Sequence, residues 1–325
     1  MPNTVLVTQP LPDQYLARLA EHAELDVLDA GESLSDPALG TRRSACYGVV
    51  CTLTDTIDRA LLKDMNMLKF VSSVSVGVDH IDVSALSVRG IALGNTPGVL
   101  ADATADTAFA LLLSAARRIA EGDRYIRDGK WTASNRWSPG FFLGKDVSGS
   151  TLGIVGLGPV GQAMARRAAG FGMTVASWTP SGRKVPGVCS LSLEALLATS
   201  DFVSVHVALA DTTRNLINGA RIATMKPGAV LINTARGGIV DESAVAAALD
   251  DGRLFAAGLD VFEEEPVPAD SLLLKHPRVV VVPHIGSATA STRLKMADRA
   301  VVNAVAALRG EPMPYCVNPE VYAAL

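Results

Sequence analysis

Short apolar runs alternate with amphipathic stretches over most of the chain. In the first hundred residues, runs rich in Val, Ile and Leu predict strands, and the mixed stretches between them predict helices. The expected strands cover residues 4–8, 25–28, 48–53, 69–74 and 91–95, and the expected helices cover residues 14–22, 59–65 and 83–89. Strands that are apolar throughout need cover on both faces, so this alternation indicates a parallel sheet between helical layers.

The same alternation restarts after residue 150. Strands are expected over residues 151–155, 174–178, 202–207, 229–233, 256–260 and 279–282, and an amphipathic helix is expected over residues 291–309. Six such units make a complete dinucleotide-binding sheet. The expected fold class is therefore α/β, with two doubly wound parallel-sheet domains of the Rossmann-like or flavodoxin-like type.

A helix and an apolar loop separate the two alternating halves. The helix is expected over residues 100–127, and its Ala-rich and Leu-rich sequence suits a link between domains. The loop, residues 129–149, contains Trp131, Trp137, Phe141 and Phe142. A loop this long and apolar is uncommon unless it binds something, and a subunit interface is the expected partner.

Composition narrows the classes of function. A chain of 325 residues is expected to form roughly two domains. Hydrophobic residues make up 49% of the chain but aromatic ones only 5%, so the core must consist mainly of Ala, Val, Leu and Ile. The net charge of -4 argues against nucleic acid as the main partner, because nucleic acid requires a basic face.

Neither a metal site nor a membrane segment is indicated. The cysteines form no C-x-x-C pair and have no histidine at zinc spacing, so we expect reduced thiols and a cytoplasmic protein. They are Cys46, Cys51, Cys189 and Cys316. The first apolar run lacks the basic segment of a signal peptide, and Asp102 and Asp106 interrupt the most apolar helix.

A glycine-rich turn predicts a dinucleotide site. It lies between the strand at residues 151–155 and a helix expected over residues 162–171, which is the context that this motif requires. The turn reads Gly156-Leu157-Gly158-Pro159-Val160-Gly161. The first glycine permits the tight turn, the second admits the pyrophosphate, and the third lets helix and strand pack closely. The helix N-terminus then offers free N–H groups to the phosphates.

The end of the next strand bears on the choice of cofactor. An acid normally stands there to bind the adenosine ribose, but this chain has Thr179, followed by Ser181, Arg183 and Lys184. Hydroxyl groups and cations accept a 2′-phosphate, which a carboxylate would repel. The sequence therefore favours NADP(H). NAD(H) stays open if Arg183 and Lys184 are merely solvated.

Three candidate reactive residues follow three further strands. Arg236 follows residues 229–233, the acidic run at 263–265 follows residues 256–260, and His284 follows residues 279–282. An arginine fork binds a carboxylate in two places, and a histidine kept charged by an acid can protonate a ketone oxygen. This set suits reduction of a 2-keto acid. The residues alone do not show which of the three glutamates would pair with the histidine. The plainer alternatives are an interdomain salt bridge for Arg236 and a structural role for His284.

Two more positions are candidates for binding. Asp260, at a strand end, is a candidate partner for the nicotinamide carboxamide or a cofactor hydroxyl. The turn at residues 75–79 follows a strand and contains Val76 and Gly77, whose N–H groups would suit the substrate carboxylate. An ordinary turn is the alternative interpretation.

Six motifs in order give the chain its resemblance to a known family. They are Ser75-Val76-Gly77-Val78-Asp79, residues 101–106, the glycine turn, residues 233–237, residues 260–266 and residues 283–287. With these segments the chain resembles the D-2-hydroxyacid dehydrogenases, and within them the glyoxylate/hydroxypyruvate reductases. The resemblance covers essentially the whole chain.

The resemblance implies a role for each matching residue. Arg236 would bind the substrate, His284 would be the general acid/base, and Glu265, the acid before a proline, would be its partner. Further substrate contacts would come from Val76, Gly77, Ser287 and Trp137. Further cofactor contacts would come from Thr104, Thr179, Ser181, Arg183, Val207, Ala208, Thr213, Thr234, Ala235, Arg236, Asp260, His284 and Gly286. The family usually has proline at Ala208, which is a mild departure.

The resemblance also implies the organisation of the molecule. Residues 1–98 with 290–325 would form the substrate domain, residues 99–289 the dinucleotide-binding domain, and the active site would lie in a cleft between them. The family forms homodimers through the long helix and the following loop, and Trp137 would reach the partner's active site. The expected ligand is a small 2-keto or 2-hydroxy acid. An NAD-dependent phosphoglycerate-type dehydrogenase, phosphite dehydrogenase and a nucleotide-sensing corepressor are the alternatives.

Overall fold

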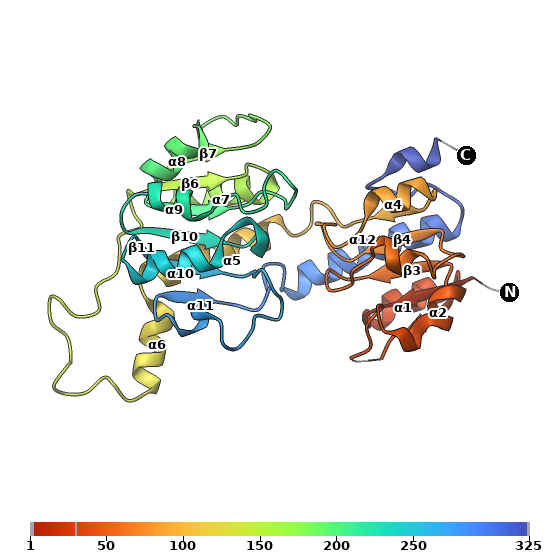
Figure 1. Cartoon of the computed structure of the whole chain (residues 1–325), viewed down its shortest axis with the longest axis horizontal. Helices are drawn as coiled ribbons and strands as arrows, with labels where there is room; N and C mark the ends of the chain where they lie inside the picture. Colours follow the sequence, from red (N-terminus) through yellow and green to blue (C-terminus); the bar gives the residue numbers. More distant parts are fainter. Residues whose placement is uncertain (1–2, 30, 324–325) are drawn as a thin grey trace. The chain divides into compact units, whose positions relative to one another are not determined.

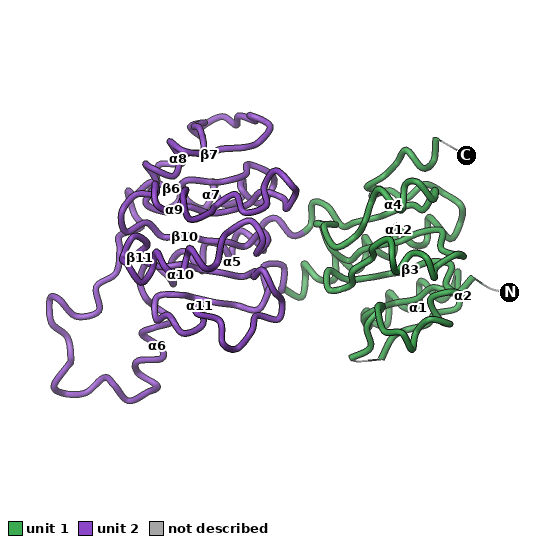
Figure 2. The backbone as a smooth tube through the Cα atoms, in the orientation of Figure 1, with its two compact units in different colours: residues 1–99, 289–325 green, residues 100–288 purple. Residues whose placement is uncertain are grey.

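A computed structural model of the protein describes residues 3–29 and 31–323. It divides into two compact units (Figure 2). Unit 1 comprises the chain up to Val99 and from Thr289 onwards, and unit 2 runs from Leu100 to Ala288. Each unit is built on a parallel sheet of its own. Among the residues described, no helix is long and apolar enough to cross a membrane.

Unit 1 contains a five-stranded sheet in the order β2-β1-β3-β4-β5, and all neighbouring strands are parallel. The strands are β1 (Thr4–Val7), β2 (Glu24–Val27), β3 (Gly48–Cys51), β4 (Phe70–Ser73) and β5 (Ala92–Gly94). The helices are α1 (Asp13–Ala20), α2 (Gly40–Ala45), α3 (Arg59–Leu62), α4 (Val83–Val88) and α12 (Ala290–Leu308), with short 3₁₀ helices η1 (Pro37–Leu39) and η3 (Pro319–Tyr322).

Helices cover both faces of this sheet (Figure 1). Leu6 of β1 belongs to a core cluster with residues of α3 and α4, whereas its neighbour Val5 belongs to a second cluster with Leu19 of α1 and Val301 of α12. These side chains are fully buried. The expected parallel sheet between helical layers is therefore confirmed.

Unit 2 contains a seven-stranded parallel sheet in the order β12-β11-β10-β9-β6-β7-β8. The strands are β6 (Thr151–Val155), β7 (Thr174–Trp178), β8 (Cys189–Ser190), β9 (Phe202–Val205), β10 (Ala229–Asn233), β11 (Leu254–Leu259) and β12 (Val279–Val281). The helices are α5 (Ala101–Ala116), α6 (Ile119–Arg127), α7 (Pro159–Gly170), α8 (Leu193–Thr199), α9 (Gly219–Thr224), α10 (Glu242–Asp250) and α11 (Leu272–Lys275), with the 3₁₀ helix η2 (Gly237–Ile239).

The topology of unit 2 leaves a crevice for a ligand. Leu231 of β10 faces a cluster that includes α8, α9 and α10, and Ile232 faces one that includes α5 and α7. From β6 the chain moves outward to β7 and β8, then returns to place β9 on the other side of β6. The strand order thus reverses between β6 and β9, and ligands of such sheets bind at the carboxyl ends of the strands at this point.

Several short elements were not expected from the sequence. The predicted six-strand sheet has a seventh edge strand, β8, whose two residues Cys189 and Ser190 are exposed, so no apolar run marks them. In unit 1, η1 and α2 occupy residues 37–45, for which the sequence pattern predicted no element. Pro37 and Gly40 weaken the helical signal there.

The single helix predicted over residues 100–127 is wrong. The structure forms α5 and α6, which are separated by Arg118 in the left-handed region, with φ 56°. A left-handed residue stops the helical hydrogen-bond ladder. The Arg118 side chain pairs with Glu121 (2.6 Å) and lies 4.1 Å from the centre of the Phe142 ring, which compensates for the break.

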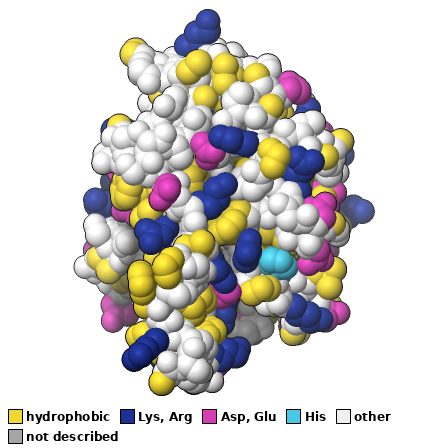
Figure 3. Space-filling model, turned by 90° about the vertical axis from the view of Figure 1, so that its left-hand side faces the viewer, with side chains coloured by type: hydrophobic (Ala, Val, Ile, Leu, Met, Phe, Trp, Pro, Cys, Tyr) yellow, Lys and Arg dark blue, Asp and Glu magenta, His cyan; other side chains and the backbone are white. Residues whose placement is uncertain are grey.

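The apolar loop that follows α6 is exposed in unit 2. Trp131, Trp137 and Leu143 are 55%, 79% and 61% exposed, and Ile126 of α6 is also exposed. Figure 3 views unit 2 from the side that carries α6 and shows hydrophobic side chains among Lys and Arg in its lower part. Several large apolar side chains exposed in one segment are typical of an interaction site.

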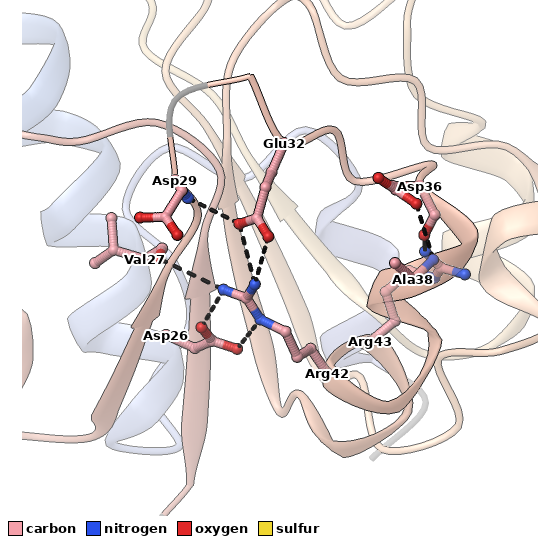
Figure 4. Close-up of polar contacts among 8 residues, drawn as sticks. All are labelled: Asp26, Val27, Asp29, Glu32, Asp36, Ala38, Arg42 and Arg43. Atoms are coloured by element: carbon pink, nitrogen blue, oxygen red, sulfur yellow. Dashed lines mark hydrogen bonds and ion pairs between the residues drawn. The ribbon is translucent and has the colours of Figure 1, made fainter.

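Two adjacent arginines of α2 make polar contacts with β2 and with the segment that follows it (Figure 4). Arg42 pairs with Asp26 of β2 and, at 3.0 Å, with Glu32. Arg43 is 5% exposed and donates hydrogen bonds to the carbonyl oxygens of Leu34 (3.0 Å) and Asp36. Helix α2 therefore supplies the donor for the buried Leu34 carbonyl, which has no other hydrogen-bond partner among the described residues.

We predict that Arg43→Met lowers the free energy of unfolding by about 1–3 kcal/mol, because it leaves the buried Leu34 carbonyl without a donor. Urea denaturation monitored by circular dichroism gives the measurement. Arg59→Met is the matched control, since the Arg59 side chain is 73% exposed in its pair with Asp82 and should cost far less. Equal losses in the two variants would contradict this account of Arg43.

Candidate functional site

The candidate reactive residues of unit 2 follow three adjacent strands. Arg236 lies three residues after β10, Asp260 directly follows β11, and His284 follows β12. Because β10, β11 and β12 are parallel neighbours, their carboxyl ends share one edge of the sheet. The fold therefore gathers residues that lie far apart in the sequence.

His284 and Glu265 form a close pair. Nδ1 of His284 lies 2.7 Å from Oε2 of Glu265, and Oε1 of Glu265 accepts a hydrogen bond from the backbone N–H of Phe262 (3.0 Å). The two side chains are 23% and 31% exposed. The pairing fixes the imidazole through Nδ1. In the part of the chain that the structure describes, Nε2 has no hydrogen-bond partner.

The surroundings of Glu265 favour its charged form. Partial burial acts against the charge, but the hydrogen bonds from His284 and from the Phe262 backbone outweigh it, with help from the charge of Arg236. Together they hold the pKa of the Glu265 carboxyl below its usual value. Glu265 is thus an ionised carboxylate in contact with the His284 imidazole.

Asp260 holds the backbone that carries His284. The Asp260 carboxylate accepts hydrogen bonds from the N–H groups of Ile285 (2.6 Å) and Gly286 (2.8 Å), and its carbonyl accepts one from the His284 N–H (2.9 Å). His284 has φ 51°, a left-handed conformation that is uncommon for a residue with a side chain. A side chain at Gly286 would meet Asp260 at 2.9 Å. Burial raises the pKa of the Asp260 carboxyl, and this effect outweighs the two backbone hydrogen bonds, which lower it.

Arg236 is placed by a tight turn. The Asn233 side chain accepts from the Ala235 N–H (3.0 Å) and donates to the Arg236 carbonyl (2.8 Å). Gly237 then passes so close to Phe262 that an added Cβ would lie 1.8 Å from its carbonyl carbon, so only glycine fits. This close approach places Arg236 near enough to Glu265 for its charge to lower the pKa of that carboxyl.

The glycine turn has the shape of a phosphate cradle. Gly156 has φ 106°, and a Cβ there would lie 2.6 Å from the His206 backbone. A Cβ at Gly161 would lie 2.0 Å from the Gly156 carbonyl oxygen. Gly158, at the N-terminus of α7, meets nothing within 4 Å, which leaves space above it. The three glycines thus match the roles expected from the sequence.

A cavity of about 360 Å³ lies beside this turn. It brings together two of the three glycines with the segments that follow β7 and β9. Its lining includes Gly156, Leu157, Gly158, Thr179, Ser181, Arg183, Val207, Ala208 and Thr213, all expected from the sequence, with Pro180 and His206 from the same segments, and Ala210 and Thr212, which were not expected. Ala210 and Thr212 lie between the expected residues Ala208 and Thr213, and that position was the available signal. His206 directly follows β9. Burial lowers the pKa of its imidazole to about 4.

Two orphaned hydroxyl groups fit a bound dinucleotide. Oγ1 of Thr179 and Oγ1 of Thr234 are buried and have no hydrogen-bond partner among the described residues. Buried polar atoms normally have partners, so each has capacity left for a ligand. With the open space at Gly158, the residues present fit a nicotinamide dinucleotide. The described residues contain no group of three or more His, Cys, Asp or Glu that could hold a metal ion.

The remaining predicted residues are distributed over both units. Thr104 of α5 is buried, and its methyl group lies 3.3 Å from the Cβ position of Gly286. Ser287 follows in the same segment of unit 2. Val76 and Gly77 belong to unit 1, in the loop after β4, and Trp137 lies in the exposed loop of unit 2.

Comparison with known proteins agrees with this geometry. Residues 109–286 match the family model of the D-isomer specific 2-hydroxyacid dehydrogenase, NAD binding domain. The chain is 45% identical to a glyoxylate reductase of Korarchaeum cryptofilum, over 99% of this chain and 97% of that one. It is 42% identical to glyoxylate/hydroxypyruvate reductase B of Yersinia enterocolitica, over 99% of both chains.

Solved structures give the same result. A crystal structure of a Thermus thermophilus protein has a TM-score of 0.90 and 45% identity, covering 97% of this chain and 99% of that one. The NADPH-dependent glyoxylate/hydroxypyruvate reductase of Sinorhizobium meliloti, in complex with NADP and malonate, has a TM-score of 0.85 and 32% identity, covering 98% of both chains. The chain belongs to the D-isomer specific 2-hydroxyacid dehydrogenase family, whose members are oxidoreductases with a nicotinamide dinucleotide cofactor.

Proposed function

We propose that the protein reduces small 2-keto acids, glyoxylate and hydroxypyruvate first among them, to D-2-hydroxy acids. The observation that carries this is the His284–Glu265 pair, whose Nε2 is left for a substrate while the charge of Arg236 lies close by. The names of the relatives, glyoxylate reductase and glyoxylate/hydroxypyruvate reductase B, support the choice of substrates.

Each residue has one task in the proposed reaction. Arg236 binds the substrate carboxylate with its planar fork. A nicotinamide dinucleotide supplies the hydride to the ketone carbon when it is bound. His284 donates the proton on Nε2 to the ketone oxygen, which leaves a neutral imidazole that is reprotonated from water. Glu265 holds Nδ1 and stabilises the charged imidazole before that transfer. In the oxidation direction, His284 accepts the hydroxyl proton.

NADPH is the proposed cofactor. Thr179 stands where a ribose-binding acid is usual, and Ser181 and Arg183 line the same cavity. A hydroxyl group and a guanidinium accept a phosphate that a carboxylate would repel. The complex of the Sinorhizobium meliloti relative with NADP supports the assignment.

The roles of the units and the assembly belong to the same proposal. Unit 2 is the dinucleotide-binding domain and unit 1 the substrate domain. A second copy of the chain covers the exposed apolar loop around Trp131 and Trp137, which would otherwise face water. The reduced cysteines and the small-acid chemistry favour the cytoplasm.

We predict that His284→Asn lowers kcat for glyoxylate about 10²- to 10⁴-fold while NADPH still binds, because only proton transfer is removed. Steady-state assays at 340 nm and calorimetric NADPH binding give the two readouts. His276→Asn is the matched control, since His276 lies 3.9 Å from Asp250, away from the Glu265 pair. An unchanged kcat in His284→Asn would refute the acid/base role. If the native protein binds NADPH but reduces no keto acid, a nucleotide-sensing function would replace the reductase.

The cofactor proposal predicts that Arg183→Ala raises the KM for NADPH about tenfold and leaves the KM for NADH unchanged, because one charge-assisted contact is lost. Lys184→Ala is the control, because Lys184 does not line the cavity. The native enzyme should also prefer NADPH. Equal or better use of NADH by the native enzyme would overturn the cofactor assignment but not the reaction.

The Glu265 pair should give a pH-dependent contribution to stability. The pKa of Glu265 is lower in the folded protein than its usual 4.5, so the contribution is present above that pH and is lost as the pH falls through the folded value. The stability difference between native protein and Glu265→Gln should therefore shrink on acidification below about pH 4.5. Urea denaturation at several pH values measures it, with Glu264→Gln as control. A stability difference between the native protein and Glu265→Gln that grows on acidification would contradict this account of the Glu265–His284 pair.

A further inference from the structure

Three successive carbonyl groups in the loop after β4 are all hydrogen-bonded within unit 1. The Ser75 carbonyl accepts from the Thr96 N–H (2.8 Å), the Val76 carbonyl from the Asn95 side chain (2.9 Å), and the Gly77 carbonyl from the Ser75 hydroxyl (2.7 Å). Two of the three donors come from the segment that directly follows β5. The loop is therefore held against the end of that strand.

The fixed carbonyl groups determine where the N–H groups point. All peptide bonds here are trans, so each N–H lies opposite to the carbonyl of the preceding residue. The N–H groups of Val76, Gly77 and Val78 are thus turned away from the partners of those carbonyls. Among the described residues, none of these three N–H groups has an acceptor, and all three residues are partly exposed. Consecutive free N–H groups in a turn can bind an anion, and these three N–H groups are called the nest below.

Asn95 is itself held by a buried residue of α12. Its carbonyl accepts a hydrogen bond from the Asn303 side chain (3.0 Å), and its N–H donates to the Tyr315 carbonyl (3.1 Å). Asn303 is fully buried and also accepts from the Tyr315 N–H (3.0 Å). A Cβ at Gly94 would lie 2.5 Å from the Asn303 amide nitrogen, so glycine is needed to admit it.

The Ser75 hydroxyl is held in a second buried network. Its one proton is used on the Gly77 carbonyl, so at the 2.7 Å contact with Ser73 it must be the acceptor and Ser73 the donor. The Ser73 oxygen is then left to accept from Nε2 of His80 (3.3 Å). Ser73 and Ser75 are 0% and 3% exposed. The buried contact with Ser73 therefore favours the Ser75 rotamer that donates to the Gly77 carbonyl.

We propose that Asn95 and Ser75 are positioning residues, which aim the N–H groups of Val76, Gly77 and Val78 at the carboxylate of the 2-keto acid. Asn303 holds Asn95 for this task. The inference rests on the proposed function for the identity of the anion. It adds residues that do not touch the substrate but fix the orientation of the N–H groups that bind its carboxylate.

The test compares Asn95→Ala and Ser75→Ala with the native protein. Each variant should raise the KM for glyoxylate about tenfold or more and weaken calorimetric binding of oxamate by a similar factor, because uniform carboxylate binding is lost. The kcat should change by less than about threefold, and the KM for NADPH should stay unchanged. A merely structural role would not separate these constants.

Ser72→Ala is the matched control. Ser72 lies on β4, the strand that precedes the loop, is fully buried, and its hydroxyl donates to the Ala300 carbonyl (2.8 Å) of α12. The Ser72→Ala variant should lower Tm about as much as the two loop variants do, and it should leave the KM for glyoxylate and the Kd for oxamate unchanged. Unaltered constants in both loop variants, or an equal shift in Ser72→Ala, would overturn the proposal. If the native protein reduces no keto acid, the proposed function fails. Oxamate binding by the native protein and the three variants would still test whether the nest binds a carboxylate.

Discussion

The left-handed turn at His284 is the constraint on which the site depends. His284 is strained at φ 51°, and the strain is held by three hydrogen bonds to one residue, the buried Asp260 at the end of β11. That turn brings the imidazole against Glu265 and leaves Nε2 for a substrate. Without it, an acid and a histidine on neighbouring strands would share an edge of the sheet without meeting in a defined geometry.

Most strands were predictable because they are apolar runs whose side chains are buried on both faces of the sheet. β6, β7 and β10 begin and end where the sequence pattern placed them. The failures have physical causes. β8 has two exposed residues, and α2 is stabilised by contacts that Arg42 and Arg43 make with distant backbone and acids. The break at Arg118 depends on contacts with Glu121 and Phe142 that local propensity does not contain.

The candidate site was predictable as a set of strand ends, but not in its internal geometry. Sequence reasoning alone left three glutamates open, and the structure pairs Glu265 with His284. Nothing in the sequence indicated that both carboxylate oxygens of Asp260 bind backbone N–H groups in the loop after β12. Ala210 and Thr212 were not expected in the cavity beside the glycine turn. These features depend on pairings between segments that no local pattern encodes.

A crystal structure of the protein with NADP⁺ and oxamate tests the central claim most directly. The account predicts that the oxamate carbonyl oxygen accepts a hydrogen bond from Nε2 of His284 and that its carboxylate lies on Arg236. It also predicts that Nδ1 of His284 keeps its contact with Glu265. Oxamate bound elsewhere, or an imidazole turned so that Nε2 faces away from the ligand, would contradict the account.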